Sequence, residues 1–223
     1  TRPWVLALLL VSGSCGLIYE ILWMRMLTLV IGNTVFVITT VLTAFMGGLA
    51  LGSFLAGRII DKIKDPLRTY GILEGGIGLY ALFLPFFIAL TDPLFRIIYQ
   101  GIGPSFYTFS LIRFAVCVII LLIPTTLMGA TLPVLSKYFV ETQSHVGWNV
   151  GLLYGVNTSG AVLGSFAAGF ILIPTLGITW TIYLAALLNL LICAGMLKLA
   201  KNRVQWEPSG GKEKSREKEQ KKQ

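Results

Sequence analysis

Apolar residues along this chain come in long runs, and glycine, proline or charged residues interrupt them. Each run is long enough for a helix that crosses the hydrocarbon core of a bilayer, which takes roughly 20 residues. A backbone in that core must satisfy its own hydrogen bonds, so every run is expected to be helical. The pattern predicts six transmembrane helices, at residues 4–31, 34–60, 69–91, 106–138, 147–173 and 177–200.

Two segments fall outside these spans. Residues 93–103 mix apolar and polar side chains but are too short to cross, so they are predicted to lie flat at the membrane interface. From Gly210 onward the chain offers no apolar side chain to bury. We therefore expect one six-helix membrane domain over residues 1–203 and a charged, disordered cytoplasmic tail over residues 204–223.

The composition agrees with a membrane protein. Hydrophobic residues make up 55% of the chain and charged residues 13%, whereas soluble domains carry roughly one quarter charged residues. The net charge of +8 does not indicate nucleic acid, because the basic residues lie beside the spans and in the tail. The expected partner is the lipid bilayer.

The distribution of basic residues predicts the orientation. With the N-terminus inside, the only basic residue in an outer loop is Arg96, whereas the inner side collects Arg2, Arg58, Lys62, Lys64, Arg68, Lys137, Lys198, Lys201, Arg203 and the tail. Positive charge favours the cytoplasmic side. The prediction is a multi-pass protein of the cell (inner, cytoplasmic) membrane with both termini in the cytoplasm, and His145 falls in a cytoplasmic loop.

No metal site or cofactor is predicted. The three cysteines, Cys15, Cys117 and Cys193, each lie within an apolar run without a CxxC or histidine partner, so we interpret them as small packing residues. The spans also lack a histidine cluster, paired carboxylates or an activated nucleophile, which argues against an intramembrane enzyme.

Two of the predicted spans carry nearly the same heptapeptide. Residues 51–57 read LGSFLAG and residues 163–169 read LGSFAAG, identical at six of seven positions. In the predicted topology these two spans run in opposite directions, so the copies are related by inversion. The prediction is an all-α bundle with a 3+3 inverted repeat; chance similarity between Gly/Ala-rich helices is the alternative.

Small residues recur at every fourth position on the same two spans, which allows close helix packing in lipid. In the second span they are Gly48, Gly52 and Ala56. In the fifth span they form two series, one of Gly151, Gly155 and Ser159 and the other of Gly160, Gly164 and Ala168. The fifth span therefore has two small faces, one more than a single neighbour needs. The additional face predicts a homodimer or contact with a second membrane half.

Residues 57–62, Gly-Arg-Ile-Ile-Asp-Lys, resemble the loop motif of the major facilitator superfamily: a glycine, three residues, an acid and a base between helices two and three. The family continues with a glycine where this chain has Lys64, so only the first half of the motif is present. With six spans and an inverted repeat, the resemblance implies half of a facilitator-type bundle.

Longer strings resemble a more specific family. At residues 12–23, 124–133, 153–161 and 169–174 the chain is similar to the membrane portion of fused facilitator/spermidine-synthase-like proteins. In that family a soluble aminopropyltransferase-like domain commonly follows the membrane part. This chain has no glycine-rich nucleotide loop after a strand, so aminopropyl transfer is not assigned to its residues and it is not expected to be an enzyme.

Ionisable residues within spans are costly, so each is a functional candidate. Counted along the helices, Glu20 lies roughly 15 Å and Arg113 roughly 10 Å from the outer surface. Helices one and four line the cavity of the facilitator fold, which implies a Glu20–Arg113 ion pair facing it; the alternatives are a purely structural pair, or Arg113 and Arg25 reaching the outer headgroups. The candidate solute site is Tyr19, Glu20, Trp23, Arg113 and Asn157.

Glu74 lies about 8 Å inside the cytoplasmic end of the third span. A pair with Lys62 or Arg58 of the neighbouring loop is expected, in gating or structure rather than binding. The predicted gating set is Gly57, Arg58, Asp61, Lys62 and Glu74.

Two functions remain open. The first is facilitator-like transport or binding of a small polar solute, with a link to polyamine metabolism that the family name alone suggests. The second is a non-transporting membrane anchor for a soluble aminopropyltransferase-like enzyme.

Overall fold

The computed structural model describes residues 2–32, 34–140 and 146–204. The predicted tail, apart from Val204, and His145 lie outside these residues. Every element in the described part of the chain is helical. The elements are α1 (Arg2–Ile31), α2 (Thr34–Ile59), the 3₁₀ turn η1 (Ile60–Lys62), α3 (Pro66–Ile102), α4 (Phe106–Val140), α5 (Val146–Ala167), the π-helical η2 (Ala168–Leu172) and α6 (Ile173–Val204).

Local sequence explains where α3 begins and where α1 and α3 end. Glycines in the left-handed region follow α1 and α3: Gly32 has φ 80° and Gly103 has φ 56°, a conformation that only glycine adopts readily. Asp65 precedes α3 and accepts a hydrogen bond from the Arg68 backbone N–H at 3.1 Å. Pro66 follows at the first helical position, where no backbone donor is needed.

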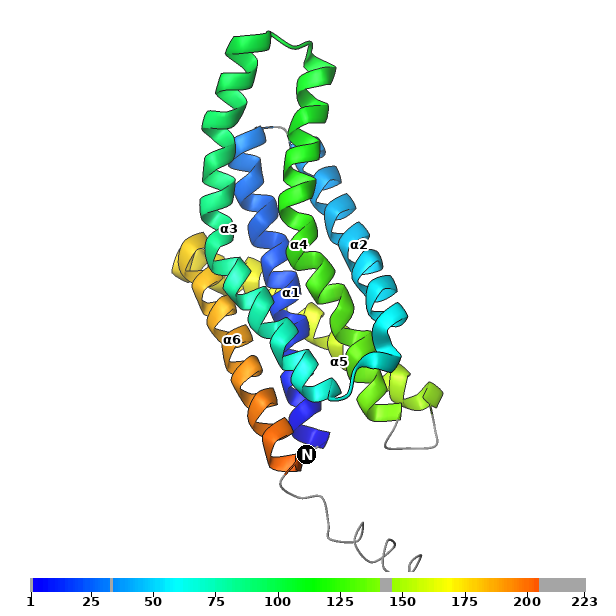
Figure 1. Ribbon diagram of the computed structural model, residues 1–223. Helices are drawn as coiled ribbons and strands as arrows, with labels where there is room; N and C mark the ends of the chain where they lie inside the picture. The colour runs from blue at the N-terminus through cyan, green and yellow to red at the C-terminus, as the bar shows by residue number, and fades with distance from the viewer. Residues whose placement is uncertain (1, 33, 141–145, 205–223) are drawn as a thin grey trace, which may run out of the picture.

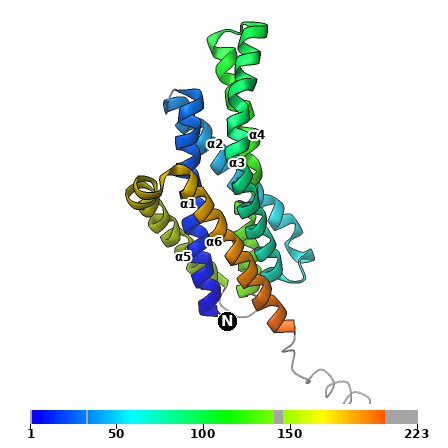
Figure 2. The same ribbon diagram turned by 90° about the vertical axis from the view of Figure 1, so that its left-hand side faces the viewer.

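The helices associate in three pairs. Helix α1 packs along α5, α2 along α4, and α3 along α6 (Figures 1 and 2). In the first pair, Gly160 abuts the carbonyl of Leu10 and Gly164 that of Ser14, so these helices run in the same direction. Helices α2 and α4 also run in the same direction. Helix α6 runs opposite to α3, and the start of α1 and the end of α6 lie at one end of the bundle, the terminal end (Figure 1).

Glycine is required at the closest of these approaches. A β-carbon on Gly52 would collide with the backbone carbonyl of Thr126, and one on Gly164 with that of Ser14. Serine hydroxyls form hydrogen bonds across the same two helix pairs. Ser53 donates to the Gly129 carbonyl at 2.8 Å, and Ser14 donates to the Gly160 carbonyl at 2.8 Å. Backbone proximity of this kind is how helices associate in lipid.

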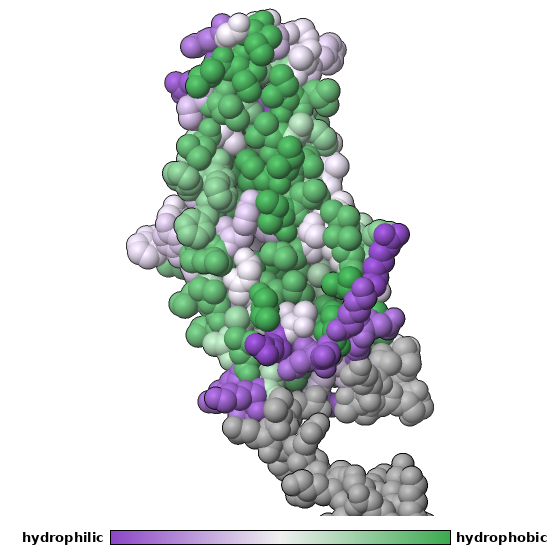
Figure 3. Space-filling model, viewed as in Figure 1, coloured by the Kyte–Doolittle hydropathy of each residue, from purple (hydrophilic) through white to green (hydrophobic). Residues whose placement is uncertain are grey.

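The helices have the length and apolar character of membrane spans. Figure 3 shows hydrophobic side chains over the middle of the bundle and hydrophilic ones toward its ends. Within the described residues, five stretches are long and apolar enough to cross a membrane, and the last of them, Gly147–Asn202, contains both α5 and α6. The predicted count of six spans is therefore met only in part.

Helices α5 and α6 share one stretch because helical hydrogen bonding continues through η2. The direction changes at Gly177, whose φ of 76° and ψ of 175° interrupt the helix. Figure 2 shows α5 and α6 as two separate helices that meet at one end. This conformation is essentially restricted to glycine.

The prediction of a flat interfacial segment at residues 93–103 is wrong. This segment continues α3, and the α3–α4 hairpin extends beyond the other helices at the end of the bundle opposite the terminal end, the distal end (Figure 1). Phe95 and Tyr99 lie against Phe109 of α4, with ring centroids 6.2 Å and 5.2 Å away. Contact between these rings favours a helix that stays upright beside α4.

Candidate functional site

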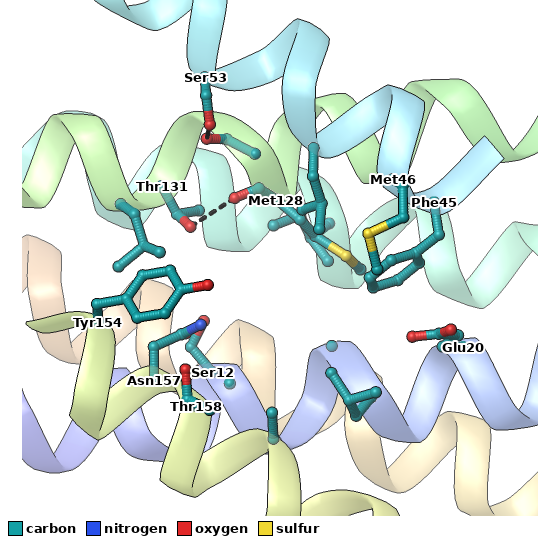
Figure 4. Close-up of a pocket in the computed structure, with 18 of the residues that line it drawn as sticks. Ser12, Glu20, Phe45, Met46, Ser53, Met128, Thr131, Tyr154, Asn157 and Thr158 are labelled. Atoms are coloured by element: carbon teal, nitrogen blue, oxygen red, sulfur yellow. Dashed lines mark hydrogen bonds between the residues drawn. The ribbon is translucent and has the colours of Figure 1, made fainter. Parts of the chain in front are cut away.

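A cavity of about 530 Å³ lies among α1, α2, α4 and α5, with one residue each from α3 and α6. Figure 4 shows its polar groups, most of them on α1 and α5. The polar lining residues are Ser12, Glu20, Ser53, Thr131, Tyr154, Asn157, Thr158 and Asn189.

Glu20 is the charged residue of this lining. Its carboxyl group points into the cavity (Figure 4), and the residue is 8% exposed. Within the described part of the chain, Glu20 has neither a hydrogen-bond nor an ion-pair partner. A buried carboxyl group without a partner is expensive. No protein donor in the described part of the chain occupies its oxygens.

The cavity has two chemically different sides. Around Glu20, helices α2 and α4 contribute Phe45, Met46 and Met128. Farther along, neutral polar groups such as Ser12 and Asn157 gather (Figure 4). Ser12 and Glu20 are separated by eight positions on α1, or about 12 Å along the helix axis. The site thus combines one acidic, partly aromatic end with one uncharged polar end.

The predicted residues Tyr19 and Trp23 do not line the cavity. Their rings stack, with centroids 5.5 Å apart, and both side chains are fully buried. The Tyr19 hydroxyl donates to the Asn189 Oδ1 at 3.1 Å. Both rings therefore support the wall behind the cavity.

Glu74 does not form the predicted pair with Lys62 or Arg58. It is fully buried and accepts hydrogen bonds from the Ser12 hydroxyl at 2.5 Å and from the Asn189 Nδ2 at 2.7 Å. Within the described residues it forms no ion pair with Lys62 or Arg58. Because Ser12 and Asn189 both line the cavity, Glu74 lies directly behind its wall.

Asn189 is the residue that sequence reasoning missed. Its amide contacts Glu74 with one end and Tyr19 with the other. The sequence feature that could have identified Asn189 is an isolated amide within the apolar run of α6, because polar groups in such helices commonly form hydrogen bonds to neighbouring helices.

Arg113 does not pair with Glu20. Its guanidinium lies 4.1 Å from the Phe109 ring centroid and donates to the Ile31 carbonyl at 3.4 Å. It lines a separate cavity of about 280 Å³ with Asp92 and Arg96. The side chain reaches toward the distal end of the bundle, the behaviour expected of a long basic side chain near a membrane surface.

The predicted loop motif lies where α2 ends. Arg58 stacks on the Phe54 ring at 4.3 Å, while Gly57, Asp61 and Lys62 are exposed. Lys137 of α4 donates to the carbonyls of Ile60 and Ile63 at 2.8 Å and 2.9 Å. That contact ties the loop to α4.

The two small faces of α5 have different surroundings. Gly160 and Gly164 pack on α1, whereas β-carbons on Gly151 and Gly155 would meet nothing within 4 Å in the described part of the chain. Gly48, with Gly52, packs on α4. The described residues contain no group of histidine, cysteine and acidic side chains that would hold a metal ion.

Comparison with known proteins gives limited similarity. No family model matches the chain, and no solved structure matches it. The chain is 25% identical over 198 residues to Polyamine aminopropyltransferase 2 of Streptomyces coelicolor, covering 86% of the chain and 33% of that protein. The chain thus spans about a third of the length of this curated relative, to which it has a weak similarity.

Proposed function

We propose that the chain is a facilitator-like membrane protein that binds a small polar solute in the cavity and moves it across the bilayer. The observation that carries this proposal is the position of the cavity between two helix pairs, α1 with α5 and α2 with α4. If residue numbers are shifted by the number of positions from Gly52 to Gly164, most residues of α1 fall on α4 and those of α2 fall on α5 or η2. The shift therefore exchanges the pair α1–α5 with the pair α4–α2.

The contacts support that relation. Gly52 meets the Thr126 carbonyl and Gly164 meets the Ser14 carbonyl. The number of positions from Gly52 to Gly164 equals that from Ser14 to Thr126. The repeated heptapeptides thus make equivalent contacts in the two halves, as expected for a 3+3 inverted repeat rather than for chance similarity.

The cavity lining follows the same shift. Several of its residues are related in pairs by this shift, namely Gly16 with Met128, Leu17 with Gly129, Glu20 with Leu132, Phe45 with Asn157, Met46 with Thr158 and Leu49 with Ala161. Secondary transporters bind their substrates at the interface between inverted repeats, near the membrane midplane. The location of this cavity therefore favours transport.

The proposal includes the predicted topology: six crossings, with α5 and α6 as separate spans and both termini in the cytoplasm. Two observations favour it. The direction of the chain reverses between α5 and α6, and the basic residues Arg58, Lys62, Lys137 and Lys198 belong to the helix ends and the loop on the terminal side. A homodimer through the open face of α5 stays a prediction.

A second candidate function is a membrane anchor. Its support is the similarity to the Streptomyces protein, which is named as an aminopropyltransferase and of which this chain spans about a third. In that case the chain holds a soluble aminopropyltransferase-like enzyme at the membrane and moves nothing. The link between the proposed transport and polyamines rests on the name of the same Streptomyces protein.

Uptake into proteoliposomes separates the two functions. We expect radiolabelled choline or putrescine, both small cations, to enter vesicles that contain the protein faster than protein-free vesicles. Glu20→Gln should reduce uptake at least about tenfold, because it removes the unpaired cavity charge. Asp92→Asn is the matched control, since Asp92 forms an exposed pair with Arg96 at 3.0 Å, a type worth little.

Absence of uptake for both solutes, with retained binding of a purified soluble aminopropyltransferase to the immobilised chain, would favour the anchor. Equal loss of uptake in Glu20→Gln and Asp92→Asn would show that uptake does not depend specifically on the cavity carboxyl group.

A further inference from the structure

The cavity holds one charge and no counter-charge. Glu20 is its acidic lining residue, and none of its lining residues in the described part of the chain is lysine, arginine or histidine. The basic side chain of Arg113 does not line this cavity and lies against Phe109 and the Ile31 carbonyl. A carboxylate in such a largely apolar space attracts a cation and repels an anion.

The second carboxyl group nearby is not open to a ligand. Both oxygens of Glu74 accept hydrogen bonds, from Ser12 and from Asn189, and the side chain has no exposed surface. The other titratable side chains that face Glu74 are Cys15, Tyr19, Tyr70 and Cys193, none of which is basic. A ligand therefore meets one acidic group.

The surroundings of Glu20 favour an organic cation. Phe45, Met46 and Met128 lie at the acidic end of the cavity (Figure 4). Aromatic faces attract ammonium groups, and thioethers contact methylene groups well. An inorganic cation would find one carboxylate and few oxygen ligands there, whereas an ammonium group with attached carbons fits both the charge and the apolar surface.

The opposite end of the cavity is polar but uncharged. Ser12, Tyr154, Asn157 and Thr158 supply hydroxyl and amide groups there (Figure 4). A neutral hydroxyl or amide on the ligand is satisfied by such groups. A second ammonium group would be buried there without direct contact to a carboxyl group, because Glu74 lies behind the wall with both oxygens already hydrogen-bonded, and such burial is costly.

We propose that the cavity selects a singly charged organic ammonium ion, with its ammonium group at Glu20 and an uncharged hydrogen-bonding group at the Ser12 and Asn157 end. This assignment rests on the proposed solute-binding function and names its substrate class. It gives an order of preference among ligands of equal length.

Four ligands with the same four-carbon chain test the assignment by calorimetric titration of the purified protein in lipid nanodiscs. They are 4-aminobutan-1-ol, putrescine, butane-1,4-diol and 4-aminobutanoate. We expect 4-aminobutan-1-ol to bind most tightly, about tenfold or more above the diol and 4-aminobutanoate, and above putrescine. In Glu20→Gln the advantage over the diol should disappear, while Glu20→Asp and the control Asp92→Asn should retain it.

Tighter binding of putrescine than of the amino alcohol, equal binding of all four ligands, or an unchanged preference in folded Glu20→Gln would overturn the assignment. The test is separate from that of transport. Selective binding without uptake of choline or putrescine would support the ligand class and contradict transport. Uptake with equal binding of the four ligands would support transport and contradict the ligand class.

Discussion

Gly52→Leu is expected to prevent α2 and α4 from packing and so to abolish the folded bundle. A side chain at this position would occupy the space of the Thr126 carbonyl and the Ala130 amide. Backbone atoms cannot move aside without separating the two helices, and the Ser53 bond to the Gly129 carbonyl would be lost with them. We expect loss of the monodisperse peak in size-exclusion chromatography in mild detergent.

The adjacent region of the same helix provides the control. Gly47 is exposed, and a β-carbon there meets nothing within 4 Å in the described structure. Gly47→Leu should therefore give a normal chromatographic profile. Because Gly164 makes the equivalent contact with Ser14, Gly164→Leu should be as damaging as Gly52→Leu. A well-folded Gly52→Leu protein would show that α2 and α4 do not pack closely at Gly52.

Asn189→Leu should lower the free energy of unfolding by about 2–4 kcal/mol, because a buried group that loses its partner costs about 1–3 kcal/mol and a charged one more. The substitution removes the donor to the Glu74 Oε2 and the acceptor of the Tyr19 hydroxyl together. Leucine has a similar size, so lost packing contributes little. Unfolding by denaturant in detergent micelles, followed by tryptophan fluorescence, measures the change.

Asn202→Leu is the matched control, since Asn202 lies exposed near the end of the same helix and should change stability by less than about 0.5 kcal/mol. Equal effects of the two substitutions would mean that the contact of Asn189 with Glu74 does not stabilise the bundle.

Much of the secondary structure follows from the sequence. Continuous apolar runs require helices in lipid, and the break before residue 177 coincides with the observed interruption at Gly177. The segment after Pro93 was wrongly separated from α3, because its composition is amphipathic. What holds it upright is contact between Phe95 and Phe109, which a reading of one segment cannot reveal.

The site was harder to predict because hydropathy does not determine how a membrane helix is rotated about its axis. Lipid-facing and core-facing positions are both apolar, so polar residues on one helix indicate depth but not direction. Depth alone suggested a Glu20–Arg113 pair. The structure brings Glu20 and Asn157 to one cavity and directs Arg113 to the distal end. Tyr19 contacts Asn189, a pairing across helices distant in sequence.

The central claim is that the cavity belongs to a transport pathway. Alternating access requires one cavity position to be reached by water from each side of the membrane in turn. Thr158 lines the cavity, and Thr158→Cys in a protein whose Cys15, Cys117 and Cys193 are replaced by alanine places a single thiol there. Tyr107→Cys at the distal end, where Tyr107 is exposed, is the one-sided control.

The decisive measurement is the reaction of this thiol with a membrane-impermeant maleimide added to right-side-out or to inside-out vesicles. If the cavity alternates between the two sides of the membrane, Thr158→Cys is labelled from both sides and Tyr107→Cys from one side only. Labelling of Thr158→Cys from a single side, with the bundle folded, would contradict transport through this cavity.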